Sequence, residues 1–182
     1  MTATEYVVLV DEHDQETGRM EKLAAHEMGA MHRAFSIFIF QDQISPLTLE
    51  SRLLLQQRAL DKYHSPGLWT NTCCSHPRSD ENILAAGNRR LQEEMGFSTP
   101  LSDQGYFHYT AQFDNGLIEN EIDHVLLGAI SGTFHFQFNP AEVATTRWIT
   151  LGDLRNEIIQ SPATFTPWLL LALRKIASDI FA

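Results

Sequence analysis

Two pairs of side chains in this sequence could together bind a metal and move a proton. Cys74 and His76 place a thiol and an imidazole two residues apart, and Glu119 and Glu121 place two carboxylates at the same spacing. In an extended chain, residues i and i+2 point to the same side. We therefore expect each pair to face a cavity, and both pairs to share one pocket if their strands meet.

Further histidines could complete a metal site. His26 and His32 lie near the start of a predicted strand, and with His76, Glu119 and Glu121 they would supply nitrogen and oxygen ligands for Zn²⁺, Mn²⁺ or a harder cation. The alternative is that His26 and His32 are scattered surface residues, because a gap of six residues is not diagnostic of a metal site.

The thiol and the carboxylates each have a second interpretation. Cys74 could be a small buried hydrophobic residue, or a thiolate that serves as a base or nucleophile. Glu119 and Glu121 lie amid apolar residues, where a carboxylate needs a partner, a metal or a proton. The alternative is an exposed strand face, which Asp123 on the same side favours. We assign the remaining histidines to the surface or to local hydrogen bonds: His13, His64, His108, His124 and His135.

Four basic residues are spread along the chain: Lys22, Arg58, Lys62 and Arg90. If they converged, they would form a strong anion site; the alternative is that they are solvated surface charges. Trp168, at the start of the last predicted helix, is either a core anchor or an aromatic face that stabilises a cation.

The composition is that of a soluble globular protein. The 182 residues, 43% of them hydrophobic, predict one domain spanning residues 1–182. Thirteen Lys and Arg against 23 Asp and Glu give a net charge of −10, which argues against binding to nucleic acid or an anionic membrane. We find no signal peptide or transmembrane run, and adjacent Cys73 and Cys74 are expected to be free thiols in the cytoplasm. The expected state is a monomer or weak dimer.

The order of predicted elements indicates an α+β fold. Strands are predicted over residues 5–10, 20–23, 33–40, 52–58, 106–113, 117–130 and 147–149, and helices over 80–95, 151–160 and 168–181. Ser79 or Asp80 is expected to cap the first helix and Gly96 to end it, while residues 150–153 form a capping box for the second. Residues 114–116 (DNG) predict a hairpin turn. The strands do not alternate with helices as in a doubly wound sheet.

The helix predicted over residues 80–95 has one narrow apolar stripe, formed by Leu84, Gly87, Leu91 and Met95. Glu94 flanks this stripe and is better placed than Glu93 to face a site beside the core. Gly87 weakens the helix by about 1 kcal/mol relative to Ala, so a close packing partner or a ligand is expected there.

Taken together, these residues resemble the type I isopentenyl diphosphate isomerases, a branch of the Nudix fold, over nearly the whole chain. The matching blocks are residues 31–36 (MHRAFS), 54–58 (LLQQR), 69–77 (WTNTCCSHP), 116–121 (GLIENE) and 166–168 (TPW). A degraded Nudix box adds Glu81, Arg89, Glu93, Glu94 and Gly96. Ser75 replaces its first Gly, and Arg90 replaces a metal-binding Glu of the hydrolases. That second replacement argues against hydrolysis and for binding of a diphosphate.

The resemblance implies a Nudix-like mixed β-sheet sandwich flanked by helices, and an isomerase of isoprenoid biosynthesis. Its substrate is isopentenyl diphosphate, and a 1,3-allylic proton shift produces dimethylallyl diphosphate. Glu121, near the metal and Tyr109, would deliver one proton, and Cys74 on the opposite side would remove the other. Trp168 would shield the carbocation by a cation–π contact.

The resemblance also implies two metal ions. One, Mn²⁺, Zn²⁺ or Mg²⁺, would be bound by His26, His32, His76, Glu119 and Glu121. A Mg²⁺ that arrives with the substrate would be held by Glu94 and the backbone carbonyl of Cys74. The diphosphate itself would contact Lys22, Arg58, Lys62 and Arg90.

Two other classes of function compete with this one. A Nudix pyrophosphohydrolase would release phosphate-bearing fragments, and Arg90 counts against it. A non-catalytic module with a structural metal would tolerate loss of Tyr109 and Trp168. Substitution of Cys74 separates the isomerase from the metal module: the isomerase should lose turnover with fold and metal retained, whereas the module should lose its metal or its fold.

Overall fold

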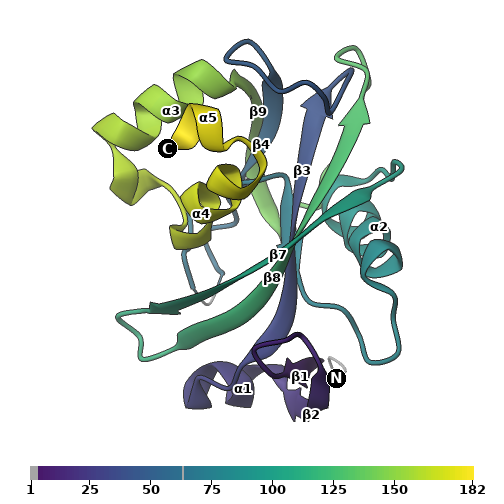
Figure 1. Cartoon of the computed structure of the whole chain (residues 1–182), viewed down its shortest axis with the longest axis vertical. Helices are drawn as coiled ribbons and strands as arrows, with labels where there is room; N and C mark the ends of the chain where they lie inside the picture. Colours follow the sequence, from purple (N-terminus) through teal and green to yellow (C-terminus); the bar gives the residue numbers. More distant parts are fainter. Residues whose placement is uncertain (1–3, 63) are drawn as a thin grey trace.

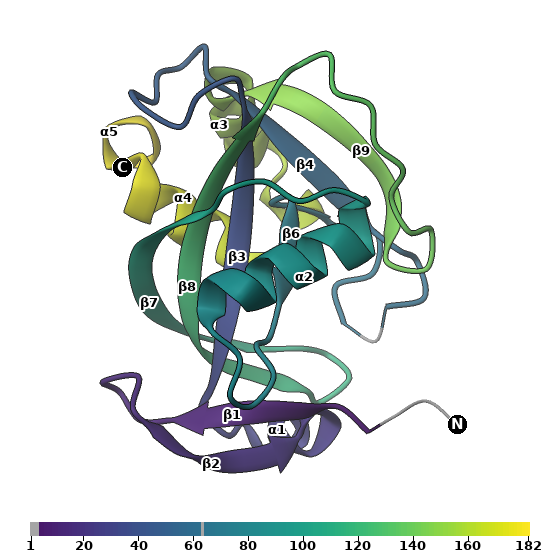
Figure 2. The same ribbon diagram turned by 90° about the vertical axis from the view of Figure 1, so that its right-hand side faces the viewer.

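A mixed β-sheet with helices on both sides forms the framework of the protein, which a computed structural model describes over residues 4–62 and 64–182 (Figures 1 and 2). The strands are β1 (Tyr6–Val10), β2 (Glu16–Glu21), β3 (His32–Gln41), β4 (Arg52–Arg58), β5 (Trp69–Thr70), β6 (Cys73–Ser75), β7 (Ser102–Gln112), β8 (Ile118–Ile130) and β9 (Val143–Thr150). The helices are α1 (Lys22–Met28), α2 (Ile83–Met95), α3 (Leu151–Gln160), α4 (Pro167–Ile176), α5 (Ser178–Phe181) and the short 3₁₀ helix η1 (Pro162–Thr164). The expected α+β class is confirmed.

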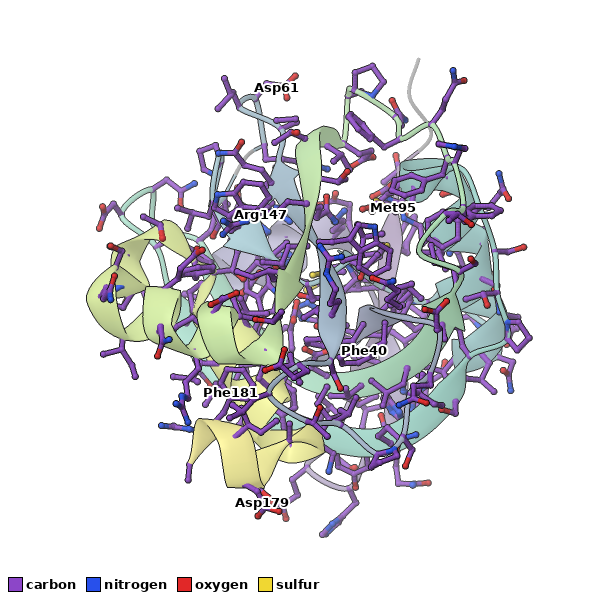
Figure 3. The ribbon with its side chains drawn as sticks, turned by 90° about the horizontal axis from the view of Figure 1, so that it is seen from above. Phe40, Asp61, Met95, Arg147, Asp179 and Phe181 are labelled. Atoms are coloured by element: carbon purple, nitrogen blue, oxygen red, sulfur yellow. The ribbon has the colours of Figure 1, made fainter. Side chains whose placement is uncertain are left out.

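Strand β3 is the centre of the sheet. It pairs in parallel with β8 along its whole length and antiparallel with β1, β4 and β6. Its alternate side chains enter two cores: Ile37 packs on the α2 side, and Phe38 packs on the side of α4. A strand buried on both faces must be nearly all apolar, which explains its run of Phe and Ile. Figure 3 shows Phe40 and Met95 in the interior, and Asp61 and Asp179 at the periphery.

Helix α2 begins three residues later than the sequence pattern predicts. Its N-cap is Asn82, whose side chain accepts a hydrogen bond from the Leu84 backbone, so the expected cap at Ser79 or Asp80 is wrong. Asp80 instead pairs with Arg19 at the surface. The expected end at Gly96 is confirmed, since Gly96 takes the left-handed conformation with φ 75°.

Gly87 allows α2 to lie directly on the sheet. A Cβ added there would lie 2.8 Å from Leu126 Cδ1 and 3.0 Å from Leu101 Cδ1. The glycine is therefore required by packing against β8 and the segment before β7, which is the first of the two expected explanations.

The N-terminal helix α1 was not expected. The predicted strand over residues 20–23 ends at Glu21. The Glu21 carboxylate accepts hydrogen bonds from the backbone N–H groups of Leu23 and Ala24 and so caps a helix. Gly29 ends that helix with φ 63°. The helix matters because it carries His26.

The C-terminal part differs from expectation in two places. Strand β9 extends beyond residues 147–149, because it pairs with β4 from Arg52 to Arg58. The helix predicted over residues 168–181 is broken into α4 and α5 at Ala177, whose φ of −146° is not helical. The N-cap at Thr150 is confirmed, since its hydroxyl accepts from the Asp153 N–H, although that hydroxyl and not the Thr150 N–H donates to the Asp153 carboxylate; the hairpin turn before β8 is also confirmed.

Candidate active site

One cavity brings together most of the residues that the sequence singled out. Among its lining are Cys74, His76, Glu94, Tyr109, Glu119, Glu121 and Trp168, together with all four basic residues of interest. Because β3 and β8 run in parallel and β6 pairs with the other edge of β3, segments that are distant in sequence meet at one end of the sheet.

Four of the expected metal ligands converge beside this cavity. The parallel register sets His32 opposite Glu121, and His32 Nε2 lies 3.2 Å from Glu121 Oε1. His76 Nε2 lies 3.0 Å from the same oxygen. The donor atoms of His26, His32, His76 and Glu121 all lie within 4.8 Å of one another. The group therefore has the donor types and the spacing of a divalent metal site.

The two histidines that the sequence left in doubt are fully buried, so the alternative of scattered surface residues is wrong. His26 Nδ1 lies 2.7 Å from the Lys22 carbonyl, and His32 Nδ1 lies 2.8 Å from the Ala30 carbonyl. These contacts orient each ring so that Nε2 faces the other donors, as in metal-binding histidines. Buried His32 Nε2 makes no hydrogen bond among the described residues. A metal ion would satisfy it.

A hydrogen-bonded group links the two glutamates. Tyr109 Oη lies 2.7 Å from Glu119 Oε2 and 2.8 Å from Glu121 Oε2. Burial and the Glu121 charge raise the pKa of Glu119 well above its usual range. Burial also acts to raise the pKa of Glu121, but the imidazoles of His32 and His76 beside it outweigh this effect and hold that pKa well below normal.

These opposite shifts define where the protons lie. A phenol has one hydrogen and cannot donate it fully to two carboxylates. Protonated Glu119 therefore donates to Tyr109 Oη, and Tyr109 donates to ionised Glu121. Both glutamates are buried, so the alternative of an exposed strand face is wrong. A divalent cation could replace the proton on Glu119 as the compensating charge.

Cys74 faces the cavity, whereas Cys73 lies in the hydrophobic core. Both are free thiols. Cys74 Sγ donates to Asn71 Oδ1 at 3.0 Å and accepts from Trp168 Nε1 at 3.2 Å. Burial, partly opposed by the Arg58 charge, raises the pKa of Cys74 to about 12. The group is thus a thiol at neutral pH in the free protein, and the expected thiolate is not its resting form.

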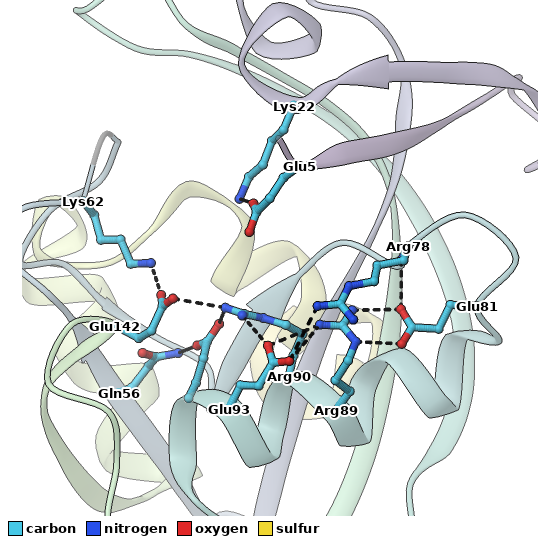
Figure 4. Close-up of polar contacts among 11 residues, drawn as sticks. Glu5, Lys22, Gln56, Lys62, Arg78, Glu81, Arg89, Arg90, Glu93 and Glu142 are labelled. Atoms are coloured by element: carbon cyan, nitrogen blue, oxygen red, sulfur yellow. Dashed lines mark hydrogen bonds and ion pairs between the residues drawn. The ribbon is translucent and has the colours of Figure 1, made fainter. Parts of the chain in front are cut away.

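The basic residues converge on the cavity, so their interpretation as separate surface charges is wrong. Each of three is already paired with a carboxylate (Figure 4). Lys22 Nζ lies 2.9 Å from Glu5, Lys62 pairs with Glu142, and Arg90 Nη2 lies 3.4 Å from the same Glu142. Glu142 therefore lies between two cations where an incoming anion would bind.

Glu94 and Glu93 take the places expected from helix geometry. Glu94 is buried at the cavity and receives hydrogen bonds from Arg90 Nη2 at 2.5 Å and Gln56 Nε2 at 3.2 Å. Glu93 lies outside the cavity, where it pairs with Arg90 and a neighbouring arginine. An anchored carboxylate at the edge of a basic pocket is suited to hold a cation that arrives with an anionic ligand.

Trp168 has both of the expected features. It is buried, and its indole N–H also donates to Asn71 Oδ1 at 3.1 Å. The Arg58 guanidinium lies 5.6 Å from the centroid of the ring. The ring thus anchors α4 and presents an aromatic face to a cation in the cavity.

The sequence interpretation missed two residues of the site. His64 was assigned to the surface or to local hydrogen bonds, but it is buried in the cavity wall with Nε2 3.4 Å from Glu119 Oε1. Burial and the Arg58 charge lower the pKa of His64 to about 2. Asp123 is fully buried and accepts a hydrogen bond from Ser36 at 2.8 Å. The i, i+2 alternation of Asp123 with Glu119 and Glu121 could have identified Asp123 as a site residue. Nothing in the local sequence around His64 indicates such a role.

Comparison with known proteins agrees with this geometry. Residues 30–169 match the NUDIX domain family. An Aromatoleum aromaticum protein named isopentenyl-diphosphate Delta-isomerase 2 is 45% identical over 172 residues, which cover 94% of this chain and 86% of the relative. A Burkholderia multivorans isopentenyl-diphosphate Delta-isomerase is 48% identical over 164 residues, 90% of this chain and 88% of the relative.

Solved structures share the fold at low sequence identity. A Deinococcus radiodurans protein superposes with a TM-score of 0.68 at 19% identity, covering 93% of this chain and 98% of its own. The MutT protein of Methanosarcina mazei Go1 gives 0.62 at 14% identity, covering 82% and 94%. Among the described residues, no helix is long and apolar enough to cross a bilayer.

Proposed function

This chain belongs to the Nudix family and, within it, to the isopentenyl-diphosphate Delta-isomerases, and from that premise we propose which of its residues carry out the conversion of isopentenyl diphosphate to dimethylallyl diphosphate. The observation that carries the proposal is the content of one cavity. A thiol, a carboxyl pair bridged by a phenol and an indole ring all line it, next to four basic residues.

The reaction needs an acid and a base on opposite sides of the small apolar C5 group of the substrate. Protonation of an unactivated double bond creates a tertiary carbocation, which water would trap, so the site must exclude water. We assign delivery of the proton to Glu121 together with Tyr109, and removal of the second proton to Cys74. The Trp168 ring would stabilise the cation between them by about 2 kcal/mol.

The protonation states of the free protein bear on this assignment. The resting protein holds a proton on Cys74 and not on Glu121. That is the state left after one forward turnover, and it is also the state that starts the reverse reaction. Cys74 and Glu121 thus behave as a coupled pair, whose protons must be exchanged before each new forward turnover.

The metal and diphosphate sites follow from the same cavity. We assign one divalent ion, Mn²⁺, Zn²⁺ or Mg²⁺, to His26, His32, His76, Glu119 and Glu121. Such an ion would supply positive charge that offsets the repulsion between two neighbouring carboxylates. Glu94 and the Cys74 carbonyl would hold a Mg²⁺ that enters with the substrate, and the diphosphate would contact Lys22, Arg58, Lys62 and Arg90.

The decisive experiment follows the carbon skeleton in D₂O. Protein with Mg²⁺ and isopentenyl diphosphate is monitored by NMR, and we expect deuterated dimethylallyl diphosphate. Cys74→Ala should lower turnover by about 10² to 10⁴, the usual contribution of a proton-transfer group, with fold and metal content retained. Cys73→Ala is the matched control, because Cys73 is the neighbouring thiol outside the cavity.

Other outcomes would support the competing functions. Released phosphate with an unchanged C5 skeleton would indicate a hydrolase. Loss of metal or of folding in Cys74→Ala would indicate a structural metal module.

We also propose that residues 1–182 form a single domain and that the protein is a monomer or weak dimer. We further propose that it binds neither nucleic acid nor membranes and that it is cytoplasmic.

A further inference from the structure

His64 lies against the proposed metal centre, although it is not among the five ligands assigned above. It belongs to the loop between β4 and β5 and is only 6% exposed. The donor atoms of His26, His64 and Glu119 all lie within 4.8 Å of one another. They form a second group of metal-binding side chains next to the four donors already described.

The two groups share His26, and this indicates one centre and not two. His26 Nδ1 is engaged with the Lys22 carbonyl at 2.7 Å, so Nε2 is the nitrogen that can reach a metal. One imidazole nitrogen binds one ion. Glu119 is in turn linked to Glu121 through the Tyr109 hydroxyl, at 2.7 Å and 2.8 Å. Both groups could therefore serve one ion that binds at His26.

The spacing between His64 and Glu119 fits two ligands of one metal. Their closest nitrogen and oxygen lie 3.4 Å apart. This exceeds the range of roughly 2.7–3.2 Å that is typical of an N–H···O hydrogen bond. With metal–ligand bonds of about 2.1 Å, adjacent donors around a tetrahedral or octahedral ion lie about 3.0–3.4 Å apart.

The surroundings of His64 fix its ring in this orientation. The ring stacks on Phe113, with centroids 5.0 Å apart and planes inclined by 27°. It meets Trp168 edge-on at 6.0 Å. The His64 carbonyl accepts a hydrogen bond from Arg58 Nη2 at 3.2 Å, which holds the backbone. The imidazole is therefore positioned toward Glu119 before any ion arrives, and preorganised donors of this kind favour tight binding.

We propose that His64 is an additional ligand of the metal centre, bound through Nε2 on the Glu119 side of the ion. This inference rests on the proposed metal centre and raises its side-chain ligands from five to six, a number suited to a six-coordinate ion. It also connects the metal to the loop that carries Lys62, one of the proposed diphosphate contacts.

The test measures metal binding without substrate. Metal-stripped protein is titrated with Co²⁺, with the visible absorption spectrum recorded and the affinity obtained by competition with a chelator. His64→Phe keeps an aromatic ring against Phe113 but removes the nitrogen, and His64→Ala removes both. The matched control is His108→Phe, because His108 lies exposed on β7, where its imidazole hydrogen-bonds to Asn120.

We expect both His64 variants to bind Co²⁺ at least tenfold more weakly, with a changed absorption spectrum, and His108→Phe to match the wild type. Wild-type affinity and spectrum in a His64 variant that circular dichroism shows to be folded would overturn the inference and leave the five-ligand centre intact. Weaker binding with an unchanged spectrum would also overturn it, because His64 would then act only through Glu119. If the wild type itself takes up no Co²⁺, the proposed centre fails and His64 fails as its ligand. Should His64→Phe not fold, His64→Ala decides alone.

Discussion

Two identical side chains on β8 have opposite protonation behaviour. Glu119 and Glu121 have the same local sequence setting, are both buried and share the Tyr109 hydroxyl. Glu121 lies 3.2 Å and 3.0 Å from the Nε2 atoms of His32 and His76, and its pKa is therefore held well below normal while that of Glu119 is raised. Partners contributed by other strands thus decide which carboxyl holds the proton.

Replacement of Glu119 by glutamine should reveal this difference in stability. The pKa of Glu119 is higher in the folded than in the unfolded protein, so its stabilising effect is complete below the unfolded pKa and is lost as pH rises through the folded pKa. Glutamine cannot ionise. Metal-stripped Glu119→Gln should therefore match the wild type at pH 4 and become more stable than it at pH 8, by about 1.4 kcal/mol per unit of pKa shift.

Urea unfolding in the presence of a chelator measures this. Glu50→Gln, an exposed substitution in the loop before β4, is the matched control. A Glu119→Gln effect of equal size at both pH values would contradict the assigned proton.

At the scale of elements, the fit between α2 and the sheet depends on one missing side chain. Gly87→Ala gains about 1 kcal/mol of helix propensity. The new Cβ would, however, lie 2.8 Å from Leu126 Cδ1 on β8, and overpacking of this kind costs about 1–3 kcal/mol. We expect net destabilisation of roughly 1–2 kcal/mol by urea unfolding. Gln92→Ala, on the exposed side of α2, should change stability by less than about 0.5 kcal/mol. Stabilisation by Gly87→Ala would show that the helix can move away from the sheet.

The loop before β9 places a carboxylate among the proposed diphosphate contacts. Glu142 pairs with Lys62 and with Arg90, so an incoming diphosphate must displace it (Figure 4). Glu142→Gln should tighten binding of inorganic pyrophosphate with Mg²⁺ about fivefold, the equivalent of roughly 1 kcal/mol. Isothermal titration calorimetry measures this. The control is Glu157→Gln, since Glu157 pairs with Arg147 outside the cavity. Weaker pyrophosphate binding in Glu142→Gln would mean that Glu142 helps to bind the anion or its metal.

At the scale of the whole molecule, the proposed metal ligands join segments that are distant in the sequence. His26 comes from α1, His32 from β3, His76 from the segment after β6, and the two glutamates from β8. A ligand that binds only the folded state stabilises it, by about 2.7 kcal/mol at a hundredfold excess over Kd. For a chain of this length that corresponds to a rise in Tm of roughly 5–10 °C.

Differential scanning calorimetry with Mn²⁺ and with a chelator checks this expectation. His76→Ala should lose most of the metal-dependent rise, while His108→Ala should keep it. An identical Tm with and without metal in the wild type would count against a centre that bridges these elements.

Local sequence was sufficient for much of the framework. The apolar run of β3, the turn before β8, the Thr150 cap and the apolar stripe of α2 each depend on neighbouring residues, whose preferences act over a few positions. Predictions from local patterns were wrong where interactions with another element determine where a helix or strand begins or ends. The Glu21 carboxylate starts α1 where a strand was predicted, and pairing with β4 extends β9 beyond its apolar core.

The sequence by itself determined which chemical groups are available: the i, i+2 spacings of Cys74 with His76 and of Glu119 with Glu121 are local properties, whereas the metal-ligand set that adds His26 and His32 was implied by the family resemblance. Tertiary structure alone decided that His64 lies beside Glu119, that the basic residues meet, and that Cys74 and Glu121 hold opposite protonation states. The reason is that desolvation and charge–charge interactions depend on distances in space. Those distances follow from how β3, β6 and β8 pair, which no short stretch of the chain encodes.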